Sequence, residues 1–417
     1  MRQTGSQTGG INRRRFLGGT LAATAAGTFI QGLASQAAEN PATTNAMPRV
    51  EYARKIKLGL IGCGGRGSWL GDLFRKHGGY EIHAVADYFP ERAEVAGSKF
   101  GVGKARRFSG LSAYKRLLAS GVEAVAVANV PRFHPEHGRA AIEAGCHVYS
   151  AKPVAVDVPG AIKVQASGKL ATDKKLCYLV DYQMATDPVN IEVVKRIHAG
   201  GLGKLGHIDS LGFSPPWGEP LIQTAEDRLR CWPATLALSG DVITENSVHS
   251  INAVLWIVGR RPVSAIGRAR ICRTNPRSEF REIYLVTYEF EDGLLWTHRC
   301  QSLHNELEWA LKADVYGDRA TALVSYRGKS YLRGGPKHYG GGEVFSLYDQ
   351  GAIRNIATFY DNISSGRFDN PTTQQASDDA LTAVLGREAA MQRRCVTMDE
   401  LLRENKELPF DLSGLIT

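Results

Sequence analysis

Residues 56–67, which read IKLGLIGCGGRG, decide the fold of the first part of this chain. Ile56 to Ile61 form a short apolar run, which is typical of a buried strand in a parallel sheet. The run passes directly into a GxGxxG loop at 62–67 and then into a helical stretch that reaches Lys76. Strand, glycine loop and helix in this order predict a βαβ unit that binds a dinucleotide.

Each position of the loop has its own expected role. Gly62 allows the tight turn, Gly64 lets the backbone approach a diphosphate, and Gly67 lets the helix pack closely on the strand. Gly65 and Arg66 lie between these glycines and are expected to border the same ligand. The diphosphate is expected on the helix N-terminus, where free backbone N–H groups point outward.

An acidic residue follows the next expected strand. That strand, Glu81 to Ala86, ends at Asp87, twenty residues beyond Gly67. A carboxylate there can accept hydrogen bonds from ribose hydroxyls and repels a 2′-phosphate. We therefore predict NAD as the cofactor, and the nearby Arg92 leaves NADP as the less favoured alternative.

Two more strands are expected at 124–130 and 147–150, with a helix at 137–144 between them. Ligands of an open parallel sheet bind outside the carboxyl ends of its strands. Lys152 is therefore expected to face the nicotinamide and the substrate, although a lysine at a strand end is often only a solvated surface residue. The residues predicted to border the cofactor at this edge are Asn129, Pro131, His134 and Lys152.

Beyond Cys177 the pattern changes to hairpins. Two pairs of strands, 283–290 with 294–301 and 311–316 with 320–326, surround short turns. Helical spacing is expected at 190–199, 352–364 and 377–393, and a flexible loop at the glycines of 334–335 and 340–342. The pattern of residues 215–233 predicts an irregular segment, which is either a lid over the site or an oligomer contact.

The N-terminus resembles an export signal. Asn12-Arg13-Arg14-Arg15-Phe16-Leu17 fits the twin-arginine pattern, and a weakly apolar stretch follows from Gly18 to about Ala34. Ser35-Gln36-Ala37 offers small residues for cleavage. A membrane anchor is the alternative, but the stretch is short and interrupted by Gly, Thr and Gln. We predict that residues 1–46 are a signal and linker, read by the twin-arginine export machinery, and that the protein is periplasmic or otherwise exported in folded form.

Charge and cysteine usage exclude other classes. The formal net charge is +9, and residues 1–46 contribute four arginines against one glutamate. The remaining charge shows no long basic run, so nucleic-acid binding is not expected. The seven cysteines are scattered without a CxxC pair, which predicts neither a disulfide framework nor a zinc site. No metal site is predicted.

Several blocks, in this order, resemble the Gfo/Idh/MocA oxidoreductase family from about residue 55 to the end of the sequence. They are the loop at 62–67, Asp87 with Pro90-Glu91-Arg92, the stretch 143–149 leading to Lys152-Pro153, and GDVITENSVH at 240–249. The resemblance implies an α/β protein with an N-terminal Rossmann domain, expected over 52–177, and a C-terminal α/β domain, expected over 178–417. The second domain should hold a large, mostly antiparallel open sheet that forms dimer or tetramer contacts.

The resemblance also implies catalytic roles. Lys152 is expected to bind the substrate hydroxyl and share its proton, and His249 to act as acid/base. Tyr182 and Gln183 stand where the family chain enters the substrate cleft, and Trp232, in the segment 215–233, is a further candidate for substrate binding.

The chain departs from the family pattern at two positions. The family's Glu-Lys-Pro begins here with Ala151, and the carboxylate four residues before the histidine is Glu245 rather than Asp. Four residues make about one helical turn, so Glu245 and His249 are expected on one helix face. Glu245 is then a catalytic candidate that should favour proton uptake by His249, whereas Lys152 should oppose it.

Together these patterns predict hydride transfer between a sugar or cyclitol hydroxyl and a tightly bound nicotinamide cofactor. Two forms of internal redox cycling are open: transhydrogenation between two sugars, and redox-assisted cleavage of a glycoside. A sugar-binding relative without chemistry is a further alternative.

Overall fold

A six-stranded parallel sheet forms from the apolar runs of the first part of the chain. This computed structural model describes residues 52, 54–345 and 347–417, so the predicted signal lies outside the described residues. The strand order, β3-β2-β1-β4-β5-β6, is that of a Rossmann sheet. Its strands are β1 (Ile56–Ile61), β2 (Tyr80–Asp87), β3 (Arg107–Ser109), β4 (Ala124–Val127), β5 (His147–Ala151) and β6 (Tyr178–Asp181).

Helices connect these parallel strands. They are α1 (Gly65–His77), α2 (Pro90–Phe100), α3 (Ala113–Leu118), α4 (His134–Glu143) and α5 (Val158–Asp173), with 3₁₀ turns at Lys104–Arg106 and Pro131–Phe133. The expected strand 124–130 ends early, at Val127, and the expected helix 137–144 begins early, at His134. Pro131 lies in the 3₁₀ turn and has no N–H with which to continue a strand ladder, and Pro135 stands in the first turn of α4, a position that suits proline.

The second sheet has nine strands in the order β14-β13-β12-β11-β7-β10-β9-β8-β15. Only β7 and β10 pair in parallel; the other neighbours are antiparallel. The strands are β7 (Leu205–Phe213), β8 (Ser264–Arg270), β9 (Ile283–Glu289), β10 (Leu295–Gln301), β11 (Ala310–Gly317), β12 (Thr321–Ser325), β13 (Gly328–Arg333), β14 (Tyr339–Val344) and β15 (Val396–Thr397). The predicted fold class, including the large and mostly antiparallel sheet, is confirmed.

Both predicted hairpins are present, as β9 with β10 and β11 with β12. The glycines of 340–342 were expected in a flexible loop, but they lie in β14. Gly341 has φ +79, and a Cβ there would lie 1.8 Å from the Ser330 oxygen. Gly341 therefore allows β14 to approach β13 closely, whereas a Cβ on Gly342 would meet Val189 and one on Gly340 would meet no atom within 4 Å.

The second part of the chain contributes eight helices in the described residues and two 3₁₀ turns. They are α6 (Pro188–His198), α7 (Ala225–Arg230), α8 (Leu236–Ser239), α9 (Val242–Glu245), α10 (Val248–Val258), α11 (Leu347–Ser365), α12 (Pro371–Gln392) and α13 (Met398–Glu404), with turns at Met184–Thr186 and Trp232–Ala234. No described helix is both long enough and apolar enough to cross a bilayer.

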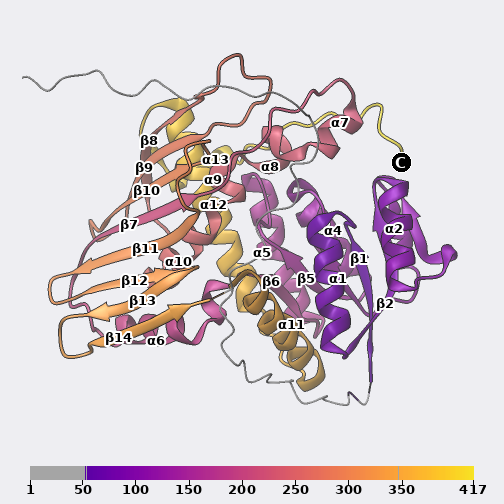
Figure 1. The fold of residues 1–417 in the computed structure, drawn as a ribbon, viewed down its shortest axis with the longest axis horizontal. Coiled ribbons are helices and arrows are strands. Elements are labelled where there is room, and N and C mark those ends of the chain that lie inside the picture. Colours follow the sequence, from indigo (N-terminus) through magenta and orange to yellow (C-terminus); the bar gives the residue numbers. More distant parts are fainter. Residues whose placement is uncertain (1–51, 53, 346) are drawn as a thin grey trace, which may run out of the picture. The chain divides into compact units, whose positions relative to one another are not determined.

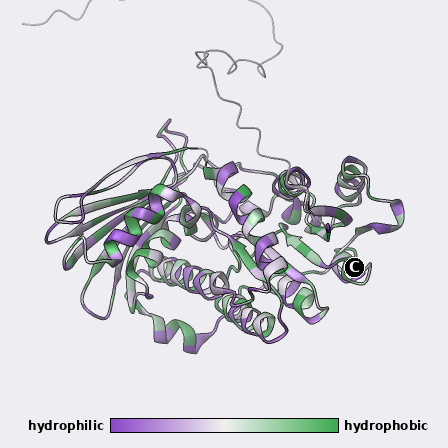
Figure 2. Cartoon of the chain, turned by 90° about the horizontal axis from the view of Figure 1, so that it is seen from below, coloured by the Kyte–Doolittle hydropathy of each residue, from purple (hydrophilic) through white to green (hydrophobic). Residues whose placement is uncertain are grey.

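Helices α5, α10 and α12 lie between the two sheets (Figure 1), and one continuous apolar core joins these helices to both. In Figure 2 hydrophobic and hydrophilic residues alternate along the helices and along the strands of the large sheet. The predicted boundary between residues 177 and 178 falls just before β6, which is the last strand of the first sheet. Helix α11 also packs on that sheet, where Phe359 stacks with Tyr80.

Candidate active site

A cavity of about 1070 Å³ opens at the carboxyl edge of the Rossmann sheet. Residues that follow β1, β2, β4, β5 and β6 line one side, and residues from the second part of the chain line the other. Ligands of doubly wound sheets bind at this edge. We call the part beside the glycine loop and Asp87 the cofactor half, and the part beside Lys152, Gln183, Glu245 and His249 the reaction half.

The glycine loop can be formed only by glycines at two positions. Gly62 has φ +94, and a Cβ there would lie 2.5 Å from the Asn129 backbone nitrogen. A Cβ on Gly67 would lie 1.8 Å from the Gly62 oxygen, so Gly67 serves helix packing and does not line the cavity.

Gly64 and Gly65 instead border open space. A Cβ on Gly65 would meet no atom within 4 Å, and one on Gly64 would meet only Arg92, at 3.7 Å. Helix α1 begins at Gly65 without a side-chain cap, so its first N–H groups have no such partner. This cradle fits a diphosphate at the helix N-terminus, as expected for a dinucleotide.

Asp87 holds the loop as well as bordering the cavity. Its Oδ2 accepts the Cys63 N–H at 2.7 Å, and its Oδ1 accepts the Phe89 N–H at 2.9 Å. Burial raises the pKa of Asp87, and these two hydrogen bonds oppose that effect. Each carboxylate oxygen keeps a second acceptor position, so the predicted contact with ribose hydroxyls is compatible with this arrangement.

His134 and Asn129 shape the edge of the cofactor half. The His134 ring nitrogens lie 2.9 Å from the backbone oxygens of Asn129 and Pro153, so the ring lies between the chain after β4 and the chain after β5. A neutral ring carries one N–H and donates to one of these two oxygens. Burial lowers the pKa of His134 to about 4, so the ring is neutral near pH 7. Asn129 Oδ1 is buried without a hydrogen-bond partner in the described chain, so it can accept from a ligand, and Pro131 lies beside it in the cavity wall.

Lys152 pairs with Glu245 across the reaction half. Lys152 Nζ donates to Glu245 Oε1 at 3.0 Å and to the Glu245 backbone oxygen at 2.6 Å. Lys152 follows β5, whereas Glu245 is the last residue of α9, so this pair joins the two parts of the chain. The pair leaves one N–H of the ammonium free to face the cavity.

The expectation that Glu245 and His249 share one helix face is wrong. Glu245 ends α9 and His249 lies in α10, and the Ser247 N–H between them bonds five residues back, to the Val242 oxygen. This wider turn shifts the register, so Glu245 reaches Lys152 instead. Both Glu245 and His249 still line the cavity.

His249 is buried against two tyrosines. Its ring centroid lies 5.1 Å from that of Tyr326 and 6.1 Å from that of Tyr182, and its Nδ1 has no partner among the described residues. Burial lowers the pKa of His249 well below its usual range, and the charges of Lys152 and Arg66 lower it further. Glu245 is paired with Lys152, so it acts on the pKa of His249 by offsetting the charge of Lys152.

A partly buried ion pair couples the glycine loop to the reaction half. The Arg66 guanidinium binds the Asp181 carboxylate and packs 4.3 Å from the Trp69 ring centroid. Asp181 also accepts from Gln183 Nε2 at 3.1 Å and from Asn355 Nδ2 at 2.9 Å. The sequence contains no signal for this network, because its members lie in three separated segments.

The three predicted substrate residues have different positions. Gln183 lines the reaction half and accepts from the Tyr326 hydroxyl at 2.9 Å. Tyr182 lies outside the cavity lining, but its ring contacts that of His249, which lines the cavity. Trp232 lines the cofactor half, where it packs with Phe89 and Val130.

Sequence reasoning missed an aromatic wall in the reaction half. Trp309, just before β11, meets Tyr326 edge-on with ring centroids 5.0 Å apart, and Tyr348 of α11 lies over Arg66. Asn246 lines the same region. Aromatic residues at the ends of predicted strands were the available signal. The described residues contain no group of three His, Cys, Asp or Glu side chains placed to hold a metal.

The cavity combines a glycine cradle, a carboxylate at the end of a strand, and a lysine and a histidine on its other side. Together these features define a dinucleotide-dependent oxidoreductase. A family model described as "Oxidoreductase family, NAD-binding Rossmann fold" matches residues 56–182, and one described as "GFO/IDH/MocA C-terminal domain" matches residues 191–323. Together they match more than half of the chain. The chain belongs to the Gfo/Idh/MocA family and is an NAD-dependent oxidoreductase, which confirms the predicted family and cofactor.

Individual relatives agree with this assignment. The chain is 26% identical to myo-inositol dehydrogenase Hyg17 of Streptomyces leeuwenhoekii, over 80% of this chain and 96% of the relative. It is 28% identical to inositol 2-dehydrogenase 4 of Saccharopolyspora erythraea, over 58% of this chain and 66% of the relative. The structure of aldose-aldose oxidoreductase from Caulobacter crescentus superposes with a TM-score of 0.66 at 19% identity, over 82% of this chain and all of that one.

Proposed function

We propose that this chain transfers a hydride between a hydroxyl-bearing carbon of a sugar or cyclitol and an NAD that stays bound between turnovers. The observation that carries the proposal is that Lys152 and His249, from separate parts of the chain, line one cavity with the glycine loop. A proton donor or acceptor and a cofactor site are thereby brought to the same substrate. The bound nicotinamide supplies the hydride acceptor.

Lys152 is suited to hold the substrate hydroxyl. Two of its three N–H bonds are directed at Glu245, which fixes the ammonium in place. The remaining N–H can donate to the substrate oxygen and stabilise the negative charge that grows on it as the proton leaves.

His249 is suited to accept that proton. Because its pKa is lowered by burial and by nearby positive charge, its ring is neutral near pH 7. A neutral ring that lines the cavity can take the hydroxyl proton and return it in the reverse reaction. Tyr182 and Tyr326 hold the ring between them.

The substrate class is supported by the lining and by relatives. Trp309, Tyr326 and Tyr348 offer apolar faces, and Gln183 and Asn246 offer hydrogen bonds, a combination that suits a ring bearing hydroxyls. Relatives named for inositol oxidation point to the same class.

Export and assembly complete the proposal. The twin-arginine pattern at residues 12–17 supports passage of the folded protein to the periplasm, where free NAD is scarce and a retained cofactor is advantageous. Exposed apolar residues on neighbouring strands of the second sheet support a dimer or tetramer through that face. They are Ile266, Leu285 and Leu295.

The test uses purified full-length protein. Protein passed through gel filtration is analysed for nucleotide, and reduced-nicotinamide absorbance is followed while inositols, aldoses and glycosides are added. Retained NAD that becomes reduced with a polyol supports the proposal. Protein that retains NAD, but whose NAD is reduced by no inositol, aldose or glycoside, would contradict the proposal.

A further inference from the structure

Two segments far apart in the sequence cover one end of the cavity. This adenosine end is formed by Asp87, Tyr88 and Phe89 after β2 and by Gly110 and Leu111 after β3. Helix α7 and residues 407–417 lie over it (Figure 1). Their contributions to the cavity wall are Leu229, Arg230, Leu412 and Thr417. We call residues 407–417 together with α7 the roof.

Arg132 anchors the first end of the roof. Its Nη2 donates to Glu407 Oε1 at 2.8 Å, and its Nη1 donates to the Leu408 oxygen. The Leu408 N–H in turn donates to Asp157 Oδ2 at 3.1 Å, and Asp157 lies 3.8 Å from Arg132. Arg132 belongs to the turn after β4, so this anchor starts at the edge of the cofactor half.

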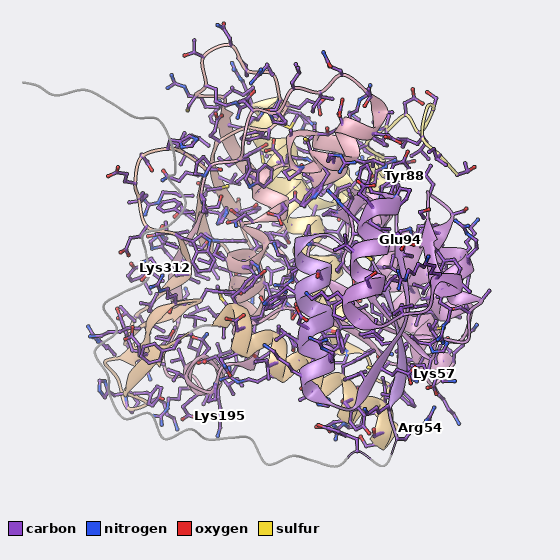
Figure 3. All side chains as sticks on the ribbon, turned by 45° about the vertical axis from the view of Figure 1, so that its right-hand side comes forward. Arg54, Lys57, Tyr88, Glu94, Lys195 and Lys312 are labelled. Atoms are coloured by element: carbon purple, nitrogen blue, oxygen red, sulfur yellow. The ribbon has the colours of Figure 1, made fainter. Side chains whose placement is uncertain are left out.

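Tyr88 anchors the other end. Its hydroxyl accepts from the Ile416 N–H at 3.1 Å and donates to Glu226 Oε1 of α7 at 2.9 Å. The Leu111 N–H also donates to the Ile416 oxygen, at 2.9 Å. One hydroxyl, on the residue next to Asp87, therefore holds both segments of the roof. Figure 3 shows Tyr88 beside the last part of the chain.

The underside of the roof is apolar. Phe410 and Leu415 pack with Phe89 and Leu229, and the Arg230 guanidinium lies 3.9 Å from the Phe89 ring centroid while it pairs with Glu91 at 2.8 Å. Contacts of this kind keep the roof closed without a bound ligand, since they join protein groups only.

We propose that the roof belongs to the cofactor site: it encloses the adenosine half of NAD and sets the rate at which NAD leaves. A dinucleotide lying from the glycine loop to Asp87 extends under this end, so its departure requires the Tyr88 and Arg132 anchors to open. This inference rests on the proposed retention of NAD, and it assigns the retention to particular residues.

The experiment measures NAD release from full-length protein with Tyr88→Phe, Arg132→Gln and both changes. Arg394→Gln is the matched control, because it removes an exposed ion pair with Glu400 that lies outside the roof. Release is followed by exchange of bound NADH for excess NAD, and folding is checked by circular dichroism and thermal unfolding.

Each anchor variant is expected to release NADH about 10-fold faster than wild type, because the loss of one or two hydrogen bonds changes a rate by about this factor. The control is expected to release NADH at the wild-type rate. Wild-type release rates in a folded Tyr88→Phe, Arg132→Gln double variant would overturn the inference. Rapid release from wild type itself would instead overturn the proposed retention, so the two failures are distinguishable.

Discussion

The two halves of the cavity are built from different materials. The cofactor half is largely backbone: a turn that only glycine can make at 62, the free start of α1, and two N–H groups held by Asp87. The reaction half is made of side chains from both parts of the chain, above all the Lys152–Glu245 pair and His249 between its tyrosines. A site made of backbone groups tolerates few substitutions but needs only a short segment of the chain. A site made of side chains depends on residues that are far apart in the sequence and are brought together by the fold.

The variant expected to separate the two halves most clearly is His249→Ala, which should abolish the acid/base step in the reaction half and leave the cofactor half intact. Turnover should fall by about 10²- to 10⁴-fold, the usual contribution of an acid/base group, while bound NAD is retained. Steady-state rates and nucleotide content measured together check both statements. His207→Ala, on the second sheet, is the control, and near-normal turnover of His249→Ala would contradict the assignment.

Gly62→Ala should do the reverse, since it damages the backbone site. A Cβ at Gly62 is strained by φ +94 and meets the Asn129 nitrogen, so NAD should bind about 100-fold more weakly. Titration of apoprotein with NADH by fluorescence measures this. Gly103→Ala is the matched control, because Gly103 has φ −61 and open space around the position of a Cβ, so alanine fits there without strain. Equal affinities in the two variants would show that the cradle is not needed.

Glu245→Gln tests the coupling within the reaction half. The amide can still accept from Lys152, but the carboxylate charge is gone, so turnover should fall by about 10-fold. Without that charge Lys152 lowers the pKa of His249 further, and the acid limb of the pH–rate profile should move to lower pH. A movement to higher pH would mean that Glu245 acts on His249 in another way. Glu143→Gln, an exposed helix change, is the control.

The smallest effect concerns stability and the cofactor half. His134 is neutral in the folded protein, with a pKa of about 4, whereas an unfolded histidine titrates near 6.5. Below pH 6.5 the unfolded chain binds a proton at this residue that the folded protein does not bind. The contribution of His134 to the free energy of unfolding is therefore fully present above pH 6.5 and declines toward pH 4. Urea unfolding at pH 7 and pH 4.5 should show that His134→Gln removes on the order of 2 kcal/mol of this decline. An unchanged decline in the variant would exclude His134 as its source.

These differences explain what the sequence allowed us to predict. The loop at 62–67, Asp87 and the strands that precede them follow from a local pattern of apolar runs and glycines, and the structure has them where expected. The Arg66–Asp181 pair and the Trp309–Tyr326 contact were missed, because they join segments whose proximity no periodicity encodes. The error at Glu245 had a local cause, a single wide turn at Ser247 that a spacing of four residues does not reveal.

Helix α11 has a consequence for how the protein is made. Its Ile356 oxygen accepts from the Tyr80 hydroxyl, and its Ala352, Ile356 and Phe359 complete the apolar cluster around Leu58 and Tyr149. Until residue 365 has left the ribosome, the part of this cluster that α11 completes is exposed and needs protection from aggregation. The NAD site is thus a late product of synthesis, completed only when almost the whole polypeptide is available.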